Sequence, residues 1–259
     1  MKNWFNLEGK VAIVTGGNRG IGKQIARGLA SLGADIVIAS RDEKLNAQTA
    51  EEVKKEFGQK VIDIKCDVKE VDQIEAMVTK VLNNFGRIDI LVNNAGRGRR
   101  KLPQDFTIEE WDEVHDTNTR SVWLCSKAVY PAMKKAGGGK IINIASINSG
   151  HPFGMAYGTA YCSSKGGVIG ITKSTALAWV KDNIQVNAIN PGWIDTEITV
   201  GARRDVPGLN EKVLARAPAE RWGKAEEMAG AAMFLASPAS DFVTGTAIPV
   251  DGGYSIQLL

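Results

Sequence analysis

The chain has 259 residues, of which 44% are hydrophobic and 24% charged, as is ordinary for a globular protein in water. The formal net charge of +3 is too small to indicate nucleic acid or a membrane surface as a partner, and no apolar run approaches the roughly 20 residues that span a bilayer. The opening residues, MKNWFNLEGK, lack the apolar core of a signal peptide, so we expect a cytoplasmic protein.

Strand-like apolar runs alternate with helix-like segments along the chain. Residues 10–17 (KVAIVTGG) end in glycines, and the apolar residues that follow from Ile21 recur at helical spacing until Gly33 can end the helix. We expect further strands, with helices such as 43–57 and 70–85 between them, at 35–40, 60–68, 88–96, 139–146, 184–192 and 246–253. The strand runs are apolar nearly throughout, as in a parallel sheet covered by helices on both faces. The pattern predicts an α/β fold, a doubly wound parallel sheet forming one domain over residues 1–259.

A glycine-rich loop, TGGNRGIG (15–22), joins the first strand to the first helix. Gly16, Gly20 and Gly22 permit a tight turn and a close approach of the backbone to a ligand, and the helix N-terminus favours a pyrophosphate. The spacing departs from the G-x-G-x-x-G fingerprint. Its position, between the first strand and helix of a βαβ unit, is what indicates a dinucleotide site.

The three cysteines are odd in number and widely spaced, which predicts reduced thiols; they are Cys66, Cys125 and Cys162. Only His115 and His151 are available as histidine ligands, and no metal-ligand spacing occurs. We therefore expect no metal site.

Five motifs in chain order resemble the short-chain dehydrogenase/reductase family. They are T-G-x-x-x-G-I-G, NNAG (93–96), Ser146, Tyr161-x-x-x-Lys165 and NPG (190–192), and together they extend over almost the whole chain. The resemblance implies a single Rossmann-type domain with about seven parallel strands, usually a homotetramer. It also implies hydride transfer between NAD(P)(H) and an alcohol–carbonyl pair, with a small-molecule alcohol or ketone as substrate.

The resemblance also assigns the cofactor site residue by residue. It places Asp67 and Val68 beside the adenine and Asn93 on the adenosine side. The complete set of matching positions is Gly16, Asn18, Arg19, Gly20, Ile21, Gly22, Ser40, Arg41, Asp67, Val68, Asn94, Ala95, Gly96, Tyr161, Lys165, Pro191, Gly192, Ile194 and Thr196.

The end of the second strand bears on which nicotinamide cofactor is used. Ser40 stands where NAD-preferring relatives usually carry an aspartate that accepts bonds from the ribose hydroxyl. Arg41 and Arg19 suit the 2′-phosphate of NADP. Asp42 could reach the ribose after a small loop shift. We favour NADP(H), with NAD(H) as the alternative.

A tyrosine with a lysine four residues later is the candidate catalytic pair. Residues i and i+4 share a face of a helix, and the ammonium of Lys165 favours the phenolate of Tyr161, which predicts a lowered phenol pKa. Tyr157 has no cation at that spacing and lies in a glycine-rich stretch, so we place it on the loop before the helix. Tyr161 is therefore assigned as general acid/base, with Ser146 as a hydrogen-bond donor to the substrate oxygen.

Two details of the catalytic set rest on the resemblance. Asn118 matches the family's fourth catalytic member, which supports a proton relay through water. Ser146 and Tyr161 are separated by slightly more residues than is usual in the family, which makes Ser149 an alternative to Ser146. Ser146 directly ends the strand run KIINIAS, so we keep it.

Substrate contacts are less specifically encoded. The GRGRRK segment (96–101) is either a solvated charged loop or a source of arginines, Arg97 and Arg100, that face a carboxylate or phosphate. The segment 197–221 lies where relatives carry a mobile lid. Tyr157 and Trp193 are further candidates for the substrate pocket, Trp193 with core packing as its alternative.

The arginines after NNAG, the GKIINIAS run and the RWG before the last helix resemble gluconate 5-dehydrogenases and 2-deoxy-3-ketogluconate-type enzymes within the family. The resulting hypothesis is an oxidoreductase (EC 1.1.1.-) that acts on an alcohol/ketone pair such as gluconate and 5-ketogluconate. A 3-oxoacyl-thioester reductase or a glucose dehydrogenase is the alternative within the family. A catalytically silent, cofactor-binding redox sensor is the alternative from another class.

Overall fold

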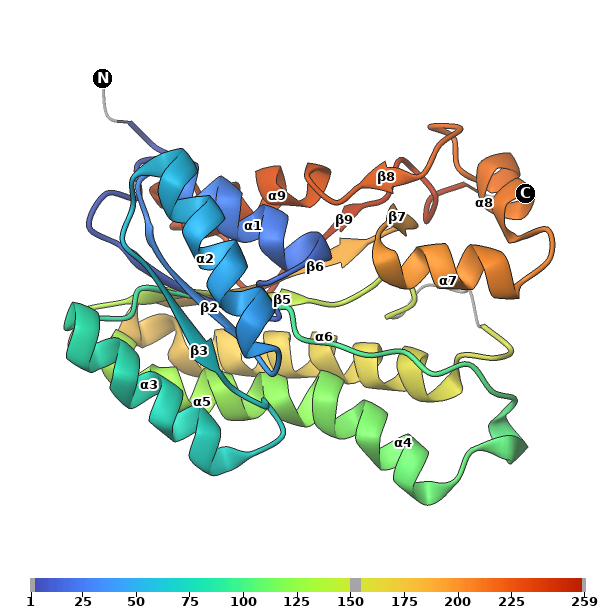
Figure 1. Cartoon of the computed structure of the whole chain (residues 1–259), viewed down its shortest axis with the longest axis horizontal. Coiled ribbons are helices and arrows are strands. Elements are labelled where there is room, and N and C mark those ends of the chain that lie inside the picture. The colour runs from blue at the N-terminus through green and yellow to red at the C-terminus, as the bar shows by residue number, and fades with distance from the viewer. Residues whose placement is uncertain (1–2, 150–154, 258–259) are drawn as a thin grey trace.

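The computed structural model describes residues 3–149 and 155–257. Seven strands pair in parallel in the order β3-β2-β1-β4-β5-β6-β9 (Figure 1). Their bounds are Val11–Thr15 (β1), Asp35–Ser40 (β2), Val61–Lys65 (β3), Ile90–Asn93 (β4), Gly139–Ile144 (β5), Ile184–Pro191 (β6) and Ala247–Val250 (β9). All seven predicted strands are confirmed, most of them shorter at the ends than the sequence suggests.

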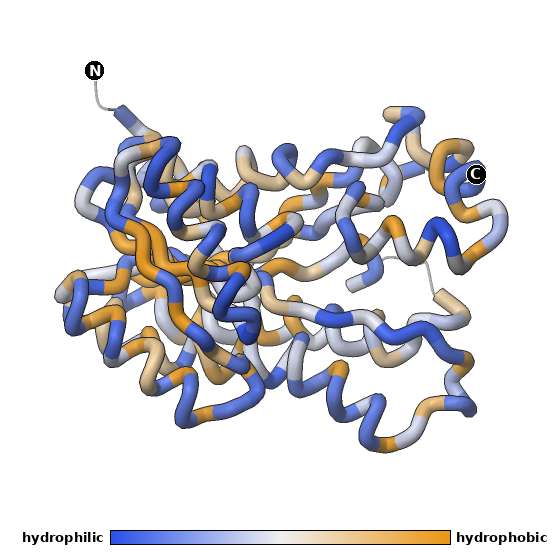
Figure 2. The backbone as a smooth tube through the Cα atoms, viewed as in Figure 1, coloured by the Kyte–Doolittle hydropathy of each residue, from blue (hydrophilic) through white to orange (hydrophobic). Residues whose placement is uncertain are grey.

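Two layers of helices cover the sheet. One layer holds α1 (Gly20–Ser31), α2 (Glu43–Phe57) and α9 (Glu227–Ala236), and the other holds α3 (Val71–Phe85), α5 (Ser121–Lys135) and α6 (Thr159–Trp179). A separate hydrophobic cluster fills the space on each face of the sheet. Hydrophobic residues accordingly concentrate along the strands in the middle of the molecule (Figure 2). The doubly wound single-domain fold is confirmed.

Local sequence signals define α2 at both ends. The Asp42 carboxylate accepts a hydrogen bond from the backbone N–H of Leu45 at 3.0 Å and caps the helix start. Gly58 ends the helix with a positive φ of 73°, a conformation that glycine adopts without strain. The helix therefore has the predicted bounds, 43–57.

The helix before α5 is interrupted in a way that the sequence does not reveal. α4 (Ile108–His115), preceded by the short 3-10 turn η1 (Pro103–Asp105), continues into a π-helical turn, η2 (Asp116–Arg120), and then into α5. A π-turn accommodates one extra residue in a helix and is frequent at functional sites. It places Asn118 in the buried interior.

The segment after β6 forms a small helical extension at one end of the sheet. It consists of β7 (Ile194–Asp195), α7 (Glu197–Asp205), α8 (Leu209–Arg216) and β8 (Gly223–Lys224) (Figure 1). The two short strands pair only with each other. Two further 3-10 turns complete the fold, η3 (Val180–Asp182) and η4 (Pro238–Ser240). In the described ranges, no helix combines the length and apolar character needed to cross a membrane.

The register of the sheet brings the functional loops to one edge. Thr15, the last residue of β1, lies opposite Asn93, and Asn93 lies opposite Asn143 of β5. The carboxyl ends of these strands therefore lie side by side. Ligands bind at this edge in sheets of this kind.

Candidate active site

Tyr161, Lys165 and Ser146 lie together at this edge of the sheet. Tyr161 and Lys165 belong to the first turns of α6, and Ser146 follows β5. The Tyr161 hydroxyl is hydrogen-bonded to Ser146. The Lys165 Nζ donates to the carbonyl oxygen of Ile144 at 2.6 Å and lies 5.9 Å from the centre of the Tyr161 ring. Three of the four residues predicted to be catalytic are thus brought into one cluster.

Burial dominates the protonation of this pair. It lowers the pKa of Lys165 to about 8 from its ordinary value of 10.5. Burial also raises the pKa of Tyr161, and the hydrogen bond to Ser146 only partly opposes this rise. The direction for Tyr161 is opposite to the expected lowering, because loss of hydration outweighs the stabilisation of the phenolate. Additional positive charge near the phenol would favour its ionisation.

The alternatives to these residues have other contacts. Tyr157 lies on a turn before α6 with 51% of its surface exposed, as predicted, and its backbone carbonyl accepts from the N–H of Lys101 at 3.2 Å. The Ser149 hydroxyl accepts the backbone N–H of Ser146 at 3.0 Å. Ser149 therefore orients the turn that carries Ser146, while Ser146 itself contacts the phenol of Tyr161.

Both the oxygen and the nitrogen of the Asn118 side-chain amide form hydrogen bonds with neighbouring groups. Its Oδ1 accepts the N–H of Arg97 at 2.8 Å, and its Nδ2 donates to the Arg97 carbonyl and to the Ser164 hydroxyl, both at 2.9 Å. The side chain thereby fixes the start of the 97–101 segment against α6. Ser164 is a functional position that we did not anticipate from the sequence, although it directly precedes the predicted lysine. A proton relay at Asn118 stays a prediction.

The glycine-rich loop is packed so closely that larger side chains are excluded. A Cβ at Gly22 would lie 2.4 Å from both the Asn94 Nδ2 and the Gly16 carbonyl oxygen. Asn94 holds the loop by donating to the carbonyls of Thr15 and Gly16, each at 3.0 Å. The Thr15 hydroxyl in turn accepts the backbone N–H groups of Asn94 and Ala95, at 3.0 and 3.1 Å.

The loop is suited to an anion. The first turn of α1 contains no acidic residue, and no side chain caps its N-terminus at Arg19. Its unpaired N–H groups are therefore available to the phosphates of a dinucleotide. Thr196, which the resemblance assigns to the cofactor site, lies next to this loop, because its methyl group is 3.7 Å from where a Cβ of Gly20 would stand. The glycine packing and the free helix terminus fit the predicted cofactor.

At the predicted adenosine side of the site, the acidic and basic groups differ in whether they already have a partner. The Asp42 carboxylate caps α2, while Arg41 is exposed and forms no ion pair with any residue of the described ranges. Asn93 is buried and donates to the Ser126 hydroxyl and to Asn143. The Asn93 side chain therefore stabilises the sheet interior, and a contact between this residue and the adenosine stays a prediction.

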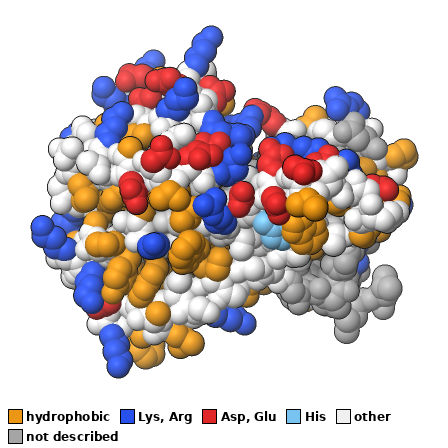
Figure 3. Space-filling model, turned by 90° about the horizontal axis from the view of Figure 1, so that it is seen from below, with side chains coloured by type: hydrophobic (Ala, Val, Ile, Leu, Met, Phe, Trp, Pro, Cys, Tyr) orange, Lys and Arg blue, Asp and Glu red, His pale blue; other side chains and the backbone are white. Residues whose placement is uncertain are grey.

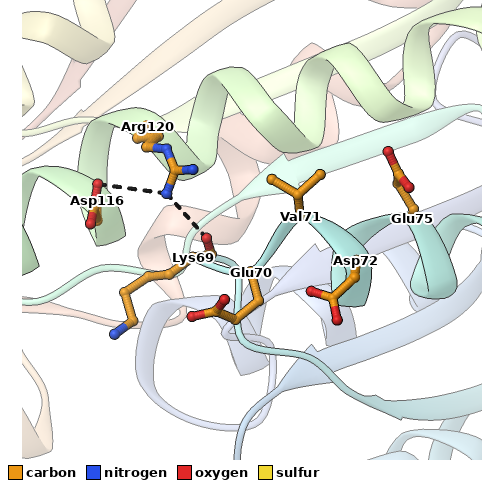
Figure 4. A pocket seen from close by; sticks show the side chains of 7 residues that line it. All are labelled: Lys69, Glu70, Val71, Asp72, Glu75, Asp116 and Arg120. Carbon is orange, nitrogen blue, oxygen red and sulfur yellow. Dashed lines mark hydrogen bonds and ion pairs between the residues drawn. The ribbon is translucent and has the colours of Figure 1, made fainter.

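A hollow of about 490 Å³ lies beside the turn that follows β3 (Figure 4). Arg120, from the π-turn η2, donates to the carbonyl oxygen of Lys69 at 3.3 Å and lies 3.8 Å from the Asp116 carboxylate. The contact ties η2 to the residues just after Asp67 and Val68. Arg120 thus supports the predicted adenine end of the site.

Ion pairs with α4 organise the cationic segment 97–101. Arg97 pairs with Glu113, Arg99 with Glu110 and Glu113, and Lys101 with Glu110. The guanidinium of Arg97 is thereby directed to α4, and a contact between Arg97 and the substrate stays a prediction. The partners in these ion pairs could not be predicted, because the bounds of α4 were not among those expected from the sequence.

The intervening residues of this segment face the catalytic pair. A Cβ at Gly96 would lie 3.6 Å from the Lys165 Nζ, and one at Gly98 would lie 3.9 Å from the Tyr161 ring. Arg100 is exposed and has no acidic partner within the described residues, whereas Arg97 and Arg99 are paired with α4. The charge of Arg100 is therefore not neutralised by an ion pair in the described structure.

Trp193 belongs to a small hydrophobic cluster beneath α7 and α8. Its ring packs edge-on against Trp222 at 5.4 Å and near Tyr254 at 6.5 Å. The Trp222 Nε1 donates to Asn210 at 3.0 Å. These contacts favour the core-packing interpretation of Trp193.

Groups that could bind metal do not gather in the described part of the chain. No cluster of three or more histidine, cysteine or acidic residues with suitable geometry is found there. Cys66 and Cys125 are buried free thiols, and burial raises the pKa of each. Neither thiol is therefore primed for nucleophilic chemistry.

A family model described as enoyl-(acyl carrier protein) reductase matches residues 16–255. The 2-dehydro-3-deoxy-D-gluconate 5-dehydrogenase of Dickeya dadantii (strain 3937) is 43% identical over 256 residues, which cover 97% of this chain and 98% of that protein. The gluconate 5-dehydrogenase of Gluconobacter oxydans (strain 621H) is 38% identical over 259 residues, with 98% of each chain covered.

The fold also matches solved structures closely. The crystal structure of a gluconate 5-dehydrogenase from Burkholderia cenocepacia J2315, in complex with NADP and tartrate, superposes with a TM-score of 0.93. The two sequences are 39% identical, and 99% of each chain is covered.

Proposed function

Because this chain belongs to the short-chain dehydrogenase/reductase family, we propose that it is an NADP(H)-dependent oxidoreductase that interconverts an alcohol and a ketone on a sugar acid. The observation that carries the proposal is the cluster of Ser146, Tyr161 and Lys165 beside a glycine loop built for a dinucleotide phosphate. The sugar-acid class rests on relatives that are gluconate and deoxygluconate dehydrogenases.

In this reaction the residues of the cluster handle the proton and the substrate oxygen. When bound, the nicotinamide supplies or accepts the hydride. Tyr161 gives its phenolic proton to the ketone oxygen during reduction and takes it back during oxidation. Ser146 donates a hydrogen bond to the same oxygen and stabilises the charge that develops there. Lys165 holds a positive charge next to the phenol, which favours the phenolate when the proton has left.

A substrate screen tests the proposal directly. Absorbance at 340 nm is followed with gluconate, 5-ketogluconate, 2-dehydro-3-deoxygluconate, glucose and a 3-oxoacyl thioester. We expect turnover of one or more of the sugar acids with NADP(H). Tight cofactor binding without turnover of any compound would favour the redox-sensor alternative instead.

NADP(H) is the proposed cofactor because Arg41, a cationic group on the adenosine side, is free and the nearest carboxylate is not. Arg41 is unpaired in the described structure, and Asp42 is committed to capping α2. Relatives of known structure bind NADP. We expect Arg41→Asp to lower the ratio of kcat/KM for NADPH over NADH by about tenfold or more, because it replaces the partner of the 2′-phosphate with a like charge. An unchanged ratio in steady-state assays would rule out Arg41 as the group that binds the phosphate.

Arg100 is the proposed partner of the substrate carboxylate. It lies two residues after Gly98, whose Cβ position is 3.9 Å from the Tyr161 ring, and, unlike Arg97, Arg99 and Lys101, it forms no ion pair with α4 in the described structure. We expect Arg100→Ala to raise KM for a sugar acid about tenfold or more, with kcat retained, since one charge-assisted bond to bound substrate is lost. Uncharged glucose, where it is a substrate, serves as the control and should show no such rise.

Two further features are proposed for the assembled enzyme. We expect residues 197–221 to act as a lid, supported by the 3.8 Å ion pair between Glu197 of α7 and Arg19 of the glycine loop. We also expect a homotetramer. Hydrophobic side chains gather on the outer surface of the α3, α5 and α6 layer (Figure 3), and Trp123 of α5 and Leu177 of α6 are exposed. Burial of such side chains between copies supports a symmetric assembly.

A further inference from the structure

The hydroxyl of Ser40 is saturated by the protein itself. Its oxygen accepts the Asn18 Nδ2 at 2.6 Å and the backbone N–H of Asp42 at 3.2 Å, and it donates to the Asn46 Oδ1 at 2.6 Å. A serine hydroxyl has one proton and two acceptor sites. The hydroxyl of Ser40 is therefore fully engaged within the protein, and a direct contact between Ser40 and the cofactor stays a prediction.

The orientation of the Asn46 amide is fixed by two groups that can only accept. Its Nδ2 lies 3.0 Å from the carbonyl oxygen of Ser40 and 3.1 Å from that of Ile64. The atom that meets two carbonyls must be the NH₂ group, so the Oδ1 must point to the side chain of residue 40. Asn46 is fully buried, and no solvent competes for these bonds.

This arrangement determines what position 40 can carry. An ionised aspartate there would place its oxygens against the Asn46 Oδ1. Both groups are acceptors, so no hydrogen bond can form between them. Rotation of the amide would not help, because it would turn Oδ1 onto the two carbonyls. The scaffold thus accepts a hydroxyl donor at residue 40 and opposes the carboxylate that reads the ribose hydroxyls of NAD(H).

We propose that Asn46 is a specificity-determining residue of the cofactor site, which acts through residue 40 to exclude a carboxylate and with it NAD(H) recognition. Asn46 is fully buried behind residue 40 and acts as a positioning residue. The inference rests on the proposed function only in that an adenine dinucleotide binds at the β2 end of the sheet.

A double-mutant cycle on cofactor binding tests the proposal without any substrate. Dissociation constants of NADH are measured by nicotinamide fluorescence for the unaltered chain, Ser40→Asp, Asn46→Ser and the double variant. NADH is the diagnostic ligand, because an aspartate at position 40 repels the 2′-phosphate of NADPH in either background. We expect Ser40→Asp alone to change the NADH constant less than about threefold, and the same change in the Asn46→Ser background to tighten it about tenfold. An equal effect in both backgrounds would overturn the proposal.

A thermal comparison keeps the proposal testable if Asn46→Ser folds poorly. Ser40→Asn and Ser40→Asp introduce side chains of the same shape, but only the amide can donate to the Asn46 Oδ1. We expect Ser40→Asp to melt at least about 3 °C below Ser40→Asn at pH 8 without cofactor. Equal melting temperatures would show that Asn46 exerts no such selection. Failure of the unaltered chain to bind NADPH would instead contradict the proposed function, and the melting comparison would still stand.

Discussion

Replacement of Tyr161 by phenylalanine is expected to lower kcat by about 10²–10⁴-fold, the range over which a positioned general acid/base contributes. The ring remains, so the packing of α6 against the 96–101 segment is kept, and only the hydroxyl that bonds to Ser146 is removed. We expect the dissociation constant of NADPH to change by less than about fivefold, since at most one neutral hydrogen bond is lost. Single-turnover kinetics and fluorescence titration measure the two effects separately.

The neighbouring tyrosine provides a matched control. Tyr157 lies one helical repeat earlier in the sequence, outside α6, and half of its surface is exposed. Tyr157→Phe should keep kcat within about threefold of the unaltered enzyme, because no catalytic group contacts its hydroxyl in the described structure. Near-normal turnover in Tyr161→Phe, or a comparable loss in Tyr157→Phe, would refute the assignment of the acid/base.

Replacement of Lys165 by methionine is expected to affect catalysis and stability in opposite directions. Loss of the ammonium beside the phenol should lower kcat by about 10²-fold or more, which corresponds to two pKa units of phenolate stabilisation. Because burial holds the pKa of Lys165 near 8 and unfolding restores it to 10.5, the unfolded chain binds more protons between these values. The unaltered protein should therefore gain about 3 kcal/mol of unfolding free energy relative to Lys165→Met as pH rises from about 8 to 10.5.

Urea denaturation at several pH values measures this difference, with Lys173→Met as the control. Lys173 lies two turns further along α6 and is exposed, so its removal should leave the pH dependence of stability as it is in the unaltered protein. A parallel pH dependence in the unaltered protein and Lys165→Met would show that the ammonium is as well hydrated in the folded chain as in the unfolded one.

The fold was predictable because its signals are local and repeated. Each buried strand is a short apolar run, and the caps of α2, Asp42 and Gly58, directly flank the predicted helix 43–57. α4 and the two-residue strands β7 and β8 were not predicted. The strands are too short for any periodic pattern, and their pairing depends on contacts distant in the sequence.

The candidate site was predictable where one turn of helix or one loop defines it. The spacing of Tyr161 and Lys165 is enough to place them on one face of a helix. The glycines of the first loop are recognisable from their position between a strand and a helix. The pairing of Arg97 with Glu113 could not be predicted, because no bounds for α4 were expected from the sequence. Asn46 left a weaker signal, since it is a polar residue in the buried stripe of α2 formed with Thr49, Ala50 and Val53. Only the structure shows that the stripe meets the end of β2.

The π-helical turn η2 joins α4 and α5 into one nearly continuous helix and separates two sets of contacts along it. On its N-terminal side α4 presents Glu110 and Glu113 to the cationic segment, and within the turn Asn118 reaches inward to Arg97 and Ser164. Each residue of a regular helix advances about 100° around the axis, so deletion of one residue here would rotate α4 by that angle relative to α5. Both sets of bonds could not survive such a rotation. The extra residue in the π-turn thus sets the rotation of α4 about the helix axis. With this rotation, α4 and η2 can both bind the 97–101 segment.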